Sequence, residues 1–265
     1  MKKRFFWALL LGASLASGFA GADGESGEKR GQAASSESLN HSDWGIQSSL
    51  ARGGRLYDKW FKEAGKPTPK ELHPAYPATS NYAKKPDSHW RCKECHGWDY
   101  QGKEGAYASG KHYSGIKGIQ AMAGKKPDQI ISLLKNDTHR LTGLISEADF
   151  QDLALFVSKG QVDMDQFINR SNKKVMGANI TKGEAYYQTI CANCHGKEGW
   201  MIKEMPPLGK VSNANPWETL HKILNGQPME EMPALRALSL EPTSRHIPLD
   251  ILAYIQTLPE EKPSN

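Results

Sequence analysis

All four cysteines of the 265-residue chain lie in two copies of one short pattern. The first copy is CKECH at residues 92–96 and the second is CANCH at residues 191–195. Two thiols three residues apart on one helical turn reach the two vinyl groups of one porphyrin, and the next imidazole then stands under the iron. Cys-x-x-Cys-His is therefore the attachment signature of c-type haem. The sequence predicts two covalently attached haem c groups, linked through Cys92, Cys95, Cys191 and Cys194, with His96 and His195 as proximal iron ligands.

Three other uses of paired cysteines fit this pattern less well. A structural zinc site needs four ligands in two nearby pairs, but 96 residues separate Cys95 from Cys191. A thioredoxin-like redox pair belongs to a βαβ context, which the surrounding sequence does not show. Local disulfides form in an oxidising compartment, but they do not need a histidine after each cysteine pair. Haem attachment is the interpretation that uses every residue of both motifs.

The N-terminal residues have the form of a secretory signal peptide. A basic stretch at residues 2–4 precedes an apolar run at 5–15, and the small residues of a cleavage site follow at 20–22. We predict cleavage after Ala22 and a periplasmic location; the alternative is an uncleaved N-terminal membrane anchor. Removal of residues 1–22 takes away three basic residues and lowers the formal net charge from +5 to +2. The basic character of the full chain therefore gives little support to nucleic-acid binding.

The composition excludes two further classes of protein. Only residues 5–20 form a sustained apolar run, which is short for a membrane-spanning helix, and the mean hydropathy is −0.62. A polytopic membrane protein is therefore excluded. Seven tryptophans, nine tyrosines and seven phenylalanines argue against a disordered chain, because disordered segments are poor in aromatic residues.

The two motifs stand in similar surroundings. An amphipathic helix is predicted before each motif, at 54–62 and 183–191, from aromatic residues at helical spacing. A helix that begins with proline follows each motif, at 127–134 and 216–224, because proline is well placed in the first helical turn. A closing apolar helix is predicted at 150–157 and at 249–258.

With this arrangement the chain resembles the class I cytochrome c fold, duplicated in tandem. The resemblance implies an all-α protein of two class I cytochrome c domains, each wrapped around one haem, with terminal helices that cross in front of it. The second half carries the family's CHG, Pro207-Leu208, Asn225-Gly226 and Met232-Pro233-Ala234. The first half departs from the pattern, because it has a proline-rich insert at 66–82 and no Met-Pro. We divide the chain into a signal peptide (1–22), a flexible polar arm (23–50), domain 1 (51–160), a linker (161–179), domain 2 (180–260) and a tail (261–265).

The sixth iron ligand of the second haem is predicted to be Met232. This residue lies 37 positions after His195 and precedes Pro233-Ala234, where the resemblance implies the axial methionine. Met229 is the nearest rival, and Met201 and Met205 read better as core methionines.

The sixth ligand of the first haem follows from the register of the two halves. Met232 lies seven residues before Ser239, and His139 lies seven residues before Ser146. We therefore predict His139 as the ligand, with Met122, His112 or an open iron position as alternatives. His73 and His89 precede the first motif, where the family places no distal ligand, and read as structural or exposed. His221 and His246 have no partner that the sequence names.

These assignments predict a diheme c-type cytochrome that passes single electrons between a donor and an acceptor, which are redox proteins in the periplasm or membrane. Methionine ligation raises the potential of a haem, so electrons should enter at the first haem and leave through the second. No catalytic residue and no small-molecule substrate are expected. The alternatives are a diheme enzyme, similar to thiosulfate dehydrogenase or a peroxidase, and a cytochrome subunit of a dehydrogenase complex. Thiosulfate dehydrogenases resemble this architecture but use a cysteine as distal ligand, and no cysteine is left over here.

Overall fold

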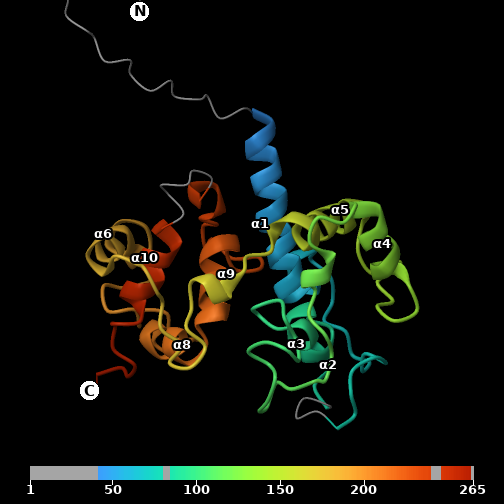
Figure 1. Cartoon of the computed structure of the whole chain (residues 1–265), viewed down its shortest axis with the longest axis horizontal. Coiled ribbons are helices and arrows are strands. Elements are labelled where there is room, and N and C mark those ends of the chain that lie inside the picture. The colour runs from blue at the N-terminus through green and yellow to red at the C-terminus, as the bar shows by residue number, and fades with distance from the viewer. Residues whose placement is uncertain (1–40, 80–83, 240–245, 264–265) are drawn as a thin grey trace, which may run out of the picture. The chain divides into compact units, whose positions relative to one another are not determined.

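The computed structural model describes residues 41–79, 84–239 and 246–263, with side chains from residue 45 onward (Figure 1). Within these ranges the chain forms helices and loops, and the only β contacts are two isolated bridges, Gly102 with Lys117 and Ile168 with Val175. The described part is therefore all-α, as predicted. The predicted signal peptide and residues 23–40 of the predicted arm lie outside the described residues.

The first long helix, α1 (His41–Glu63), carries the aromatic residues that the sequence places at helical spacing. Tyr57 and Phe61 lie one turn apart and both are buried, as is Trp60. The helix departs from helical dihedral angles at Lys59 (φ −155°, ψ 76°). It begins at His41, inside the segment 23–50 that we expected to be a flexible arm, because Leu50 at the end of that segment and the adjoining Ala51 are already buried against the fold.

Six further helical elements, all shorter than α1, complete the first half within the described residues. The elements are α2 (Pro86–His89), α3 (Cys92–His96), η1 (Gln120–Met122), α4 (Pro127–Lys135), α5 (Glu147–Leu155) and η2 (Phe156–Gly160). Helix α4 begins at the predicted proline. Ser146 caps α5 through a capping box with Asp149, which satisfies two backbone N–H groups at that helix start.

The second half likewise has a helix before its motif, a short helix within the motif and further helices after it. It consists of η3 (Met164–Gln166), α6 (Ile180–Ile190), α7 (Ala192–His195), α8 (Leu208–Ala214), α9 (Pro216–Asn225), η4 (Arg236–Ser239) and α10 (His246–Ile255). Asn215 caps α9 by accepting a hydrogen bond from the backbone N–H of Glu218. The predicted linker at 161–179 is not purely polar in its packing, because Met164 and Ile168 are fully buried in the core.

One helix crossing occurs in each half with the same local chemistry. A Cβ atom on Gly53 of α1 would lie 2.1 Å from the carbonyl oxygen of Asp152 on α5, and one on Gly183 of α6 would lie 1.9 Å from that of Asp250 on α10. Only glycine therefore lets either helix pair approach so closely.

A tyrosine follows each of these two glycines by four residues. The Tyr57 hydroxyl donates to the carbonyl of Gly97 at 2.6 Å, and the Tyr187 hydroxyl donates to that of Gly196 at 2.7 Å. Each acceptor is the glycine that directly follows a CxxCH motif. The crossing helix pair thus positions the motif in the same way in both halves.

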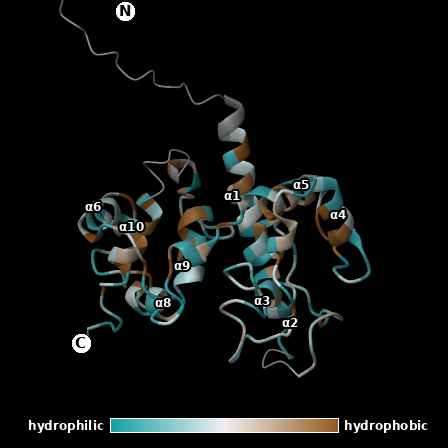
Figure 2. Cartoon of the chain, in the orientation of Figure 1, coloured by the Kyte–Doolittle hydropathy of each residue, from teal (hydrophilic) through white to brown (hydrophobic). Residues whose placement is uncertain are grey.

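The two halves share a core and belong to one compact unit, Leu39–Asn265. Helix α9 of the second half packs against α1 of the first, and a Cβ atom on Gly54 would lie 2.3 Å from Cγ of Asn225. Helices α4 and α9 carry both hydrophobic and hydrophilic residues, as the colouring in Figure 2 shows, so each has an apolar side to bury. In the described part of the chain, no helix combines the length and the apolar character that a bilayer crossing requires.

Candidate functional site

The first CxxCH motif forms helix α3, whose two cysteines are free and partly buried. Burial raises the pKa of both thiols, Cys92 and Cys95, to about 12. Among the described residues, no group of three or more histidine, cysteine or acidic side chains is arranged to hold a metal ion. The zinc alternative therefore finds no ligand set in the described residues, and the disulfide alternative finds no bridge.

The structure brings His139 opposite His96. The two imidazole rings have centroids 6.3 Å apart and planes inclined by 27°. A metal-bound imidazole nitrogen lies about 2 Å from a first-row metal and roughly 1 Å from the centre of its own ring, so two rings on opposite sides of one iron have centres about 6 Å apart. The spacing of His96 and His139 therefore fits a single iron between them.

Both of these rings are oriented by a hydrogen bond from Nδ1. His96 Nδ1 lies 2.7 Å from the carbonyl oxygen of Lys117, and His139 Nδ1 lies 2.9 Å from that of Leu133. A carbonyl only accepts, so each Nδ1 carries the proton and each Nε2 keeps its lone pair for a metal. Burial lowers the pKa of His96 to about 4 and also lowers the pKa of His139. Both rings are therefore neutral at pH 7, which is the form that binds a metal.

The loop that carries His139 is held by the proline-rich insert. The side chain of Asn136 accepts hydrogen bonds from the backbone N–H groups of Thr138 and His139, each at 3.0 Å. His73, from the insert, donates through Nε2 to the carbonyl oxygen of His139 at 3.2 Å. His73 also packs edge-on against Trp90, with ring centroids 4.4 Å apart. The insert thus supports the loop, in agreement with a structural reading of His73.

The other candidates of the first half have different surroundings. His112 Nδ1 lies 2.9 Å from a carboxylate oxygen of Glu94, and its ring stacks on Tyr107. Met122 ends the short helix η1 and is partly buried. His89 is buried and stacks on Tyr76, with ring centroids 4.0 Å apart.

The second CxxCH motif occupies the end of α6 and helix α7. Cys191 is partly buried and Cys194 is exposed, and both are free thiols. Burial raises the pKa of Cys191 to about 11 and lowers that of His195. The backbone N–H of Met201 donates to the carbonyl oxygen of His195 at 2.9 Å, and Gly196 has φ +78°, which favours glycine. The donor set of two thiols and one neutral imidazole suits covalent haem here as it does in the first half.

The four candidate methionines of the second half differ in exposure. Met229 and Met201 have 63% and 52% of their surface exposed, whereas Met205 and Met232 are partly buried. Met205 packs against the hydrophobic core, as expected for a core methionine. Met232 lies in the loop after α9, and its carbonyl oxygen would be 2.7 Å from a Cβ atom on Gly226. This loop therefore folds back directly on the end of α9.

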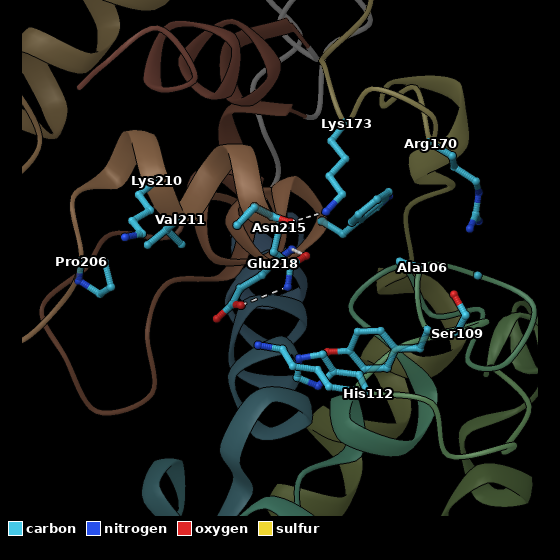
Figure 3. Close-up of a pocket in the computed structure, with 15 residues that line it drawn as sticks. Ala106, Ser109, His112, Arg170, Lys173, Pro206, Lys210, Val211, Asn215 and Glu218 are labelled. Carbon is cyan, nitrogen blue, oxygen red and sulfur yellow. Dashed lines mark hydrogen bonds between the residues drawn. The ribbon is translucent and has the colours of Figure 1, made fainter. Parts of the chain in front are cut away.

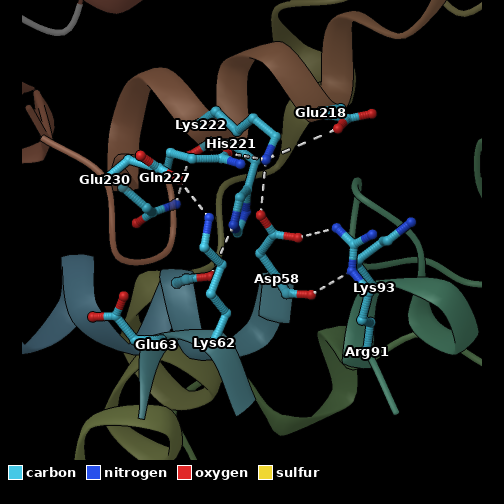
Figure 4. Close-up of polar contacts among 12 residues, drawn as sticks. Asp58, Lys62, Glu63, Arg91, Lys93, Glu218, His221, Lys222, Gln227 and Glu230 are labelled. Atoms are coloured by element: carbon cyan, nitrogen blue, oxygen red, sulfur yellow. Dashed lines mark hydrogen bonds and ion pairs between the residues drawn. The ribbon is translucent and has the colours of Figure 1, made fainter. Parts of the chain in front are cut away.

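A buried ionic network joins the first motif to α9 (Figure 4). Asp58 of α1 is 1% exposed and forms ion pairs with Arg91, which directly precedes Cys92, and with Lys222 of α9 at 2.8 Å. Burial alone would raise the pKa of Asp58, but the charges of Lys222 and Arg91 hold it well below its usual range. The carboxylate is therefore ionised at neutral pH.

His221 is a buried link between the halves that the sequence did not reveal. It is fully buried, with Nε2 at 2.9 Å from the carbonyl oxygen of Gly54 and Nδ1 at 2.8 Å from the Tyr100 hydroxyl. Burial lowers its pKa to about 3, so the ring is neutral, donates to Gly54 and accepts from Tyr100. A lone histidine on a predicted helix gives no sign of such partners, since both lie more than 100 residues away.

A cavity of about 620 Å³ lies beside the motifs without containing them (Figure 3). Its walls come from the loop at 105–112, from Arg170 and Lys173 of the linker, and from α8 and the start of α9. Lys173 donates to the carbonyl oxygen of Ala214 at 2.9 Å, and Arg170 pairs with Asp165 at 2.6 Å. The neighbouring loop at 102–118 supplies the Lys117 carbonyl that orients His96.

Comparison with known proteins places the second motif in a cytochrome family. Residues 178–244 match the family model described as cytochrome C oxidase, cbb3-type, subunit III. No curated protein matches the chain. The matched segment contains the second CxxCH motif and Met232, and it implies covalent haem c and redox protein partners. The match and the helical structure together support a c-type cytochrome that functions in electron transfer.

Proposed function

We propose that the chain is a diheme c-type cytochrome that transfers single electrons between redox proteins outside the cytoplasm. The observation that carries this proposal is the placement of His139 opposite His96 at a spacing that suits one iron. It gives the first motif, which lies outside the matched family segment, a complete set of haem ligands. The repeated Gly–Tyr contact of the crossing helices supports two tandem cytochrome c domains.

Each proposed haem has its own set of protein groups. In the first half Cys92 and Cys95 would form the thioethers, and His96 and His139 would bind the iron. In the second half the corresponding groups are Cys191, Cys194, His195 and Met232. When bound, haem c supplies one-electron chemistry at iron.

The protein side chains set the direction of electron flow in this proposal. Two hydrogen-bonded imidazoles at the first iron favour its ferric form, whereas a thioether at the second favours the ferrous form. Electrons would therefore enter at the first haem and leave through the second. The interface between α1 and α9 supports exchange within the molecule, because it packs the two halves into one unit.

A second candidate is a cytochrome subunit of a larger membrane complex. The printed description of the matched family, an oxidase subunit, is the observation that favours it. In that case the electron acceptor would be another subunit rather than a diffusing protein. Purification from mild detergent extracts of native membranes separates the two candidates, because a subunit would elute with its complex and a free carrier would not.

An enzyme of the peroxidase type is less well supported by the geometry. Such an enzyme needs a vacant iron position for its substrate, whereas in this proposal His139, whose ring lies 6.3 Å from that of His96, would fill that position. Reaction with peroxide at the first haem would therefore require displacement of His139.

Mass spectrometry and electron paramagnetic resonance of the oxidised holoprotein test the proposal. We expect a mass increase of two haems and two low-spin signals, one of the His/His type and one of the His/Met type. His139→Ala should convert only the first signal to high spin, and Met232→Ala should alter only the second. A single haem, or an unchanged first signal in His139→Ala, would contradict the proposal.

A further inference from the structure

The loop that carries Met232 is held in place by residues of the first half of the chain. This segment, residues 226–236, leads from α9 into η4, and the N–H of Leu235 donates to the carbonyl oxygen of Ile223 in α9 at 3.0 Å. Its contacts with the first half of the chain fall into two groups. A central link comes from α1, and an anchor at the C-terminal end comes from Arg236.

The central link consists of Arg55 and Glu63, two residues of α1 that lie about two turns apart. Arg55 donates from Nη1 to the carbonyl oxygen of Asn225, the last residue of α9, at 3.0 Å. It also donates from Nε to Oε1 of Glu63 at 2.9 Å. The other carboxylate oxygen of Glu63, Oε2, accepts from the backbone N–H of Met229 at 3.1 Å. The pair therefore joins the start of the loop to its middle.

This link is built to fix one backbone conformation. The Glu63 residue is 8% exposed, so its carboxylate keeps little contact with water; Arg52 lies 3.8 Å from the oxygen that accepts from Arg55, whereas Oε2 accepts from the Met229 N–H. Met229 has φ +52°, a left-handed conformation that costs free energy in residues other than glycine. The hydrogen bond to Glu63 compensates for that cost. Arg55, through its contact with the Asn225 carbonyl, also places a positive charge at the C-terminal end of α9, where the helix dipole makes it favourable.

The anchor is Arg236, at the C-terminal end of the loop. It donates to the side-chain oxygen of Asn225 at 2.8 Å and to the carbonyl oxygen of Gly160, in the first half, at 3.0 Å. Asn225 is itself fully buried and in close contact with Gly54 of α1. The loop is thus tied to the first half at its start, middle and end.

We infer that Glu63 and Arg55 are positioning residues that hold Met232 as an iron ligand, so that the first half of the chain determines the axial ligation of the second haem. This inference rests on the proposed function, in which Met232 binds the second iron. Without the link, the loop would sample other conformations at Met229, and the thioether would compete less well with other ligands. The second haem, from which electrons would leave, thus depends on contact between the halves for its sixth ligand.

Titration of the oxidised holoprotein with imidazole tests the inference, because imidazole displaces a methionine ligand and abolishes the far-red methionine–iron absorption band. We expect Glu63→Gln to lower the apparent Kd for imidazole about tenfold, the factor that corresponds to about 1.4 kcal/mol and to loss of a hydrogen bond to a charged group. An amide has one acceptor oxygen and cannot serve both the Arg55 and the Met229 donors. Arg55→Lys loses the guanidinium group that donates to both Asn225 and Glu63. It should therefore also lower the Kd for imidazole.

The matched control is Glu230→Gln. Glu230 belongs to the same loop and pairs with Lys62 of the same helix (Figure 4), but its side chain is 55% exposed, so its removal should leave the Kd within twofold of the wild-type value. If Glu63→Gln and Arg55→Lys also remain within twofold while their thermal midpoints fall, the link stabilises the fold only and the inference is wrong. A wild-type protein without the far-red band would overturn the Met232 assignment together with the inference. A wild-type band that Met232→Ala abolishes, together with unchanged imidazole Kd values in both Glu63→Gln and Arg55→Lys, would overturn the inference alone.

Discussion

Replacement of Asp58 by asparagine removes the buried carboxylate that pairs with both Arg91 and Lys222 and so links the first CxxCH motif to α9. The Asp58 side chain is 2% exposed, and its two cationic partners, Arg91 and Lys222, are 22% and 19% exposed. Removal of one partner from a buried ion pair costs roughly 3–5 kcal/mol. Because both cations retain some solvent contact, we expect the low end of that range, about 3 kcal/mol.

Guanidinium unfolding of the holoprotein, followed by far-ultraviolet circular dichroism, measures this loss. The control is Glu147→Gln, which breaks an ion pair with Lys135 whose carboxylate side chain is 74% exposed; exposed pairs contribute about 0–1 kcal/mol. A loss in Asp58→Asn no greater than in Glu147→Gln would refute the reasoning, since it would mean that solvent already screens the network.

The same variant has a defined pH dependence. The folded state lowers the pKa of Asp58, so its stabilising contribution is complete above the unfolded-state pKa of about 3.9 and is lost as the pH falls toward the lower folded-state value. The stability difference between wild type and Asp58→Asn should therefore stay constant from pH 7 to about 5 and shrink only below about pH 4.

Two further substitutions test the helix crossing and the buried histidine. Gly183→Ala places a methyl group 1.9 Å from the carbonyl oxygen of Asp250 and should destabilise the holoprotein by about 1–3 kcal/mol. The control Gly45→Ala, with open space around the glycine, should not destabilise it. Equal thermal midpoints for the two variants would contradict the close crossing. His221→Phe should cost about 1–3 kcal/mol because it leaves the Tyr100 hydroxyl and the Gly54 carbonyl without their partner. Since burial lowers the pKa of His221 to about 3, the wild type should lose stability from about pH 6.5 downward, and His221→Phe should lack that component in denaturant titrations at several pH values.

Several elements of the fold follow from local sequence chemistry. Pro127 and Pro216 mark the starts of α4 and α9, because the missing N–H of proline costs nothing in the first helical turn. The CxxCH motifs predict their own helical turns, because two thiols three residues apart reach one porphyrin from a single turn. The register between His139 and Met232 is visible because duplicated segments keep their spacing, and the structure places His139 opposite His96. What the sequence determined by itself is thus the pair of CxxCH motifs, with the haem attachment that they predict, and the helices that border them.

The tertiary structure alone decided how the halves meet. The partners of His221, the link from Glu63 to the Met229 N–H and the contact of Gly54 with Asn225 join residues more than 100 positions apart. Such contacts depend on the angle and distance at which α1 and α9 pack, and helical periodicity carries no information about either quantity. The start of α1 at His41 was missed for the same reason, since burial of Leu50 and Ala51 against the fold, rather than local propensity, stabilises that part of the helix.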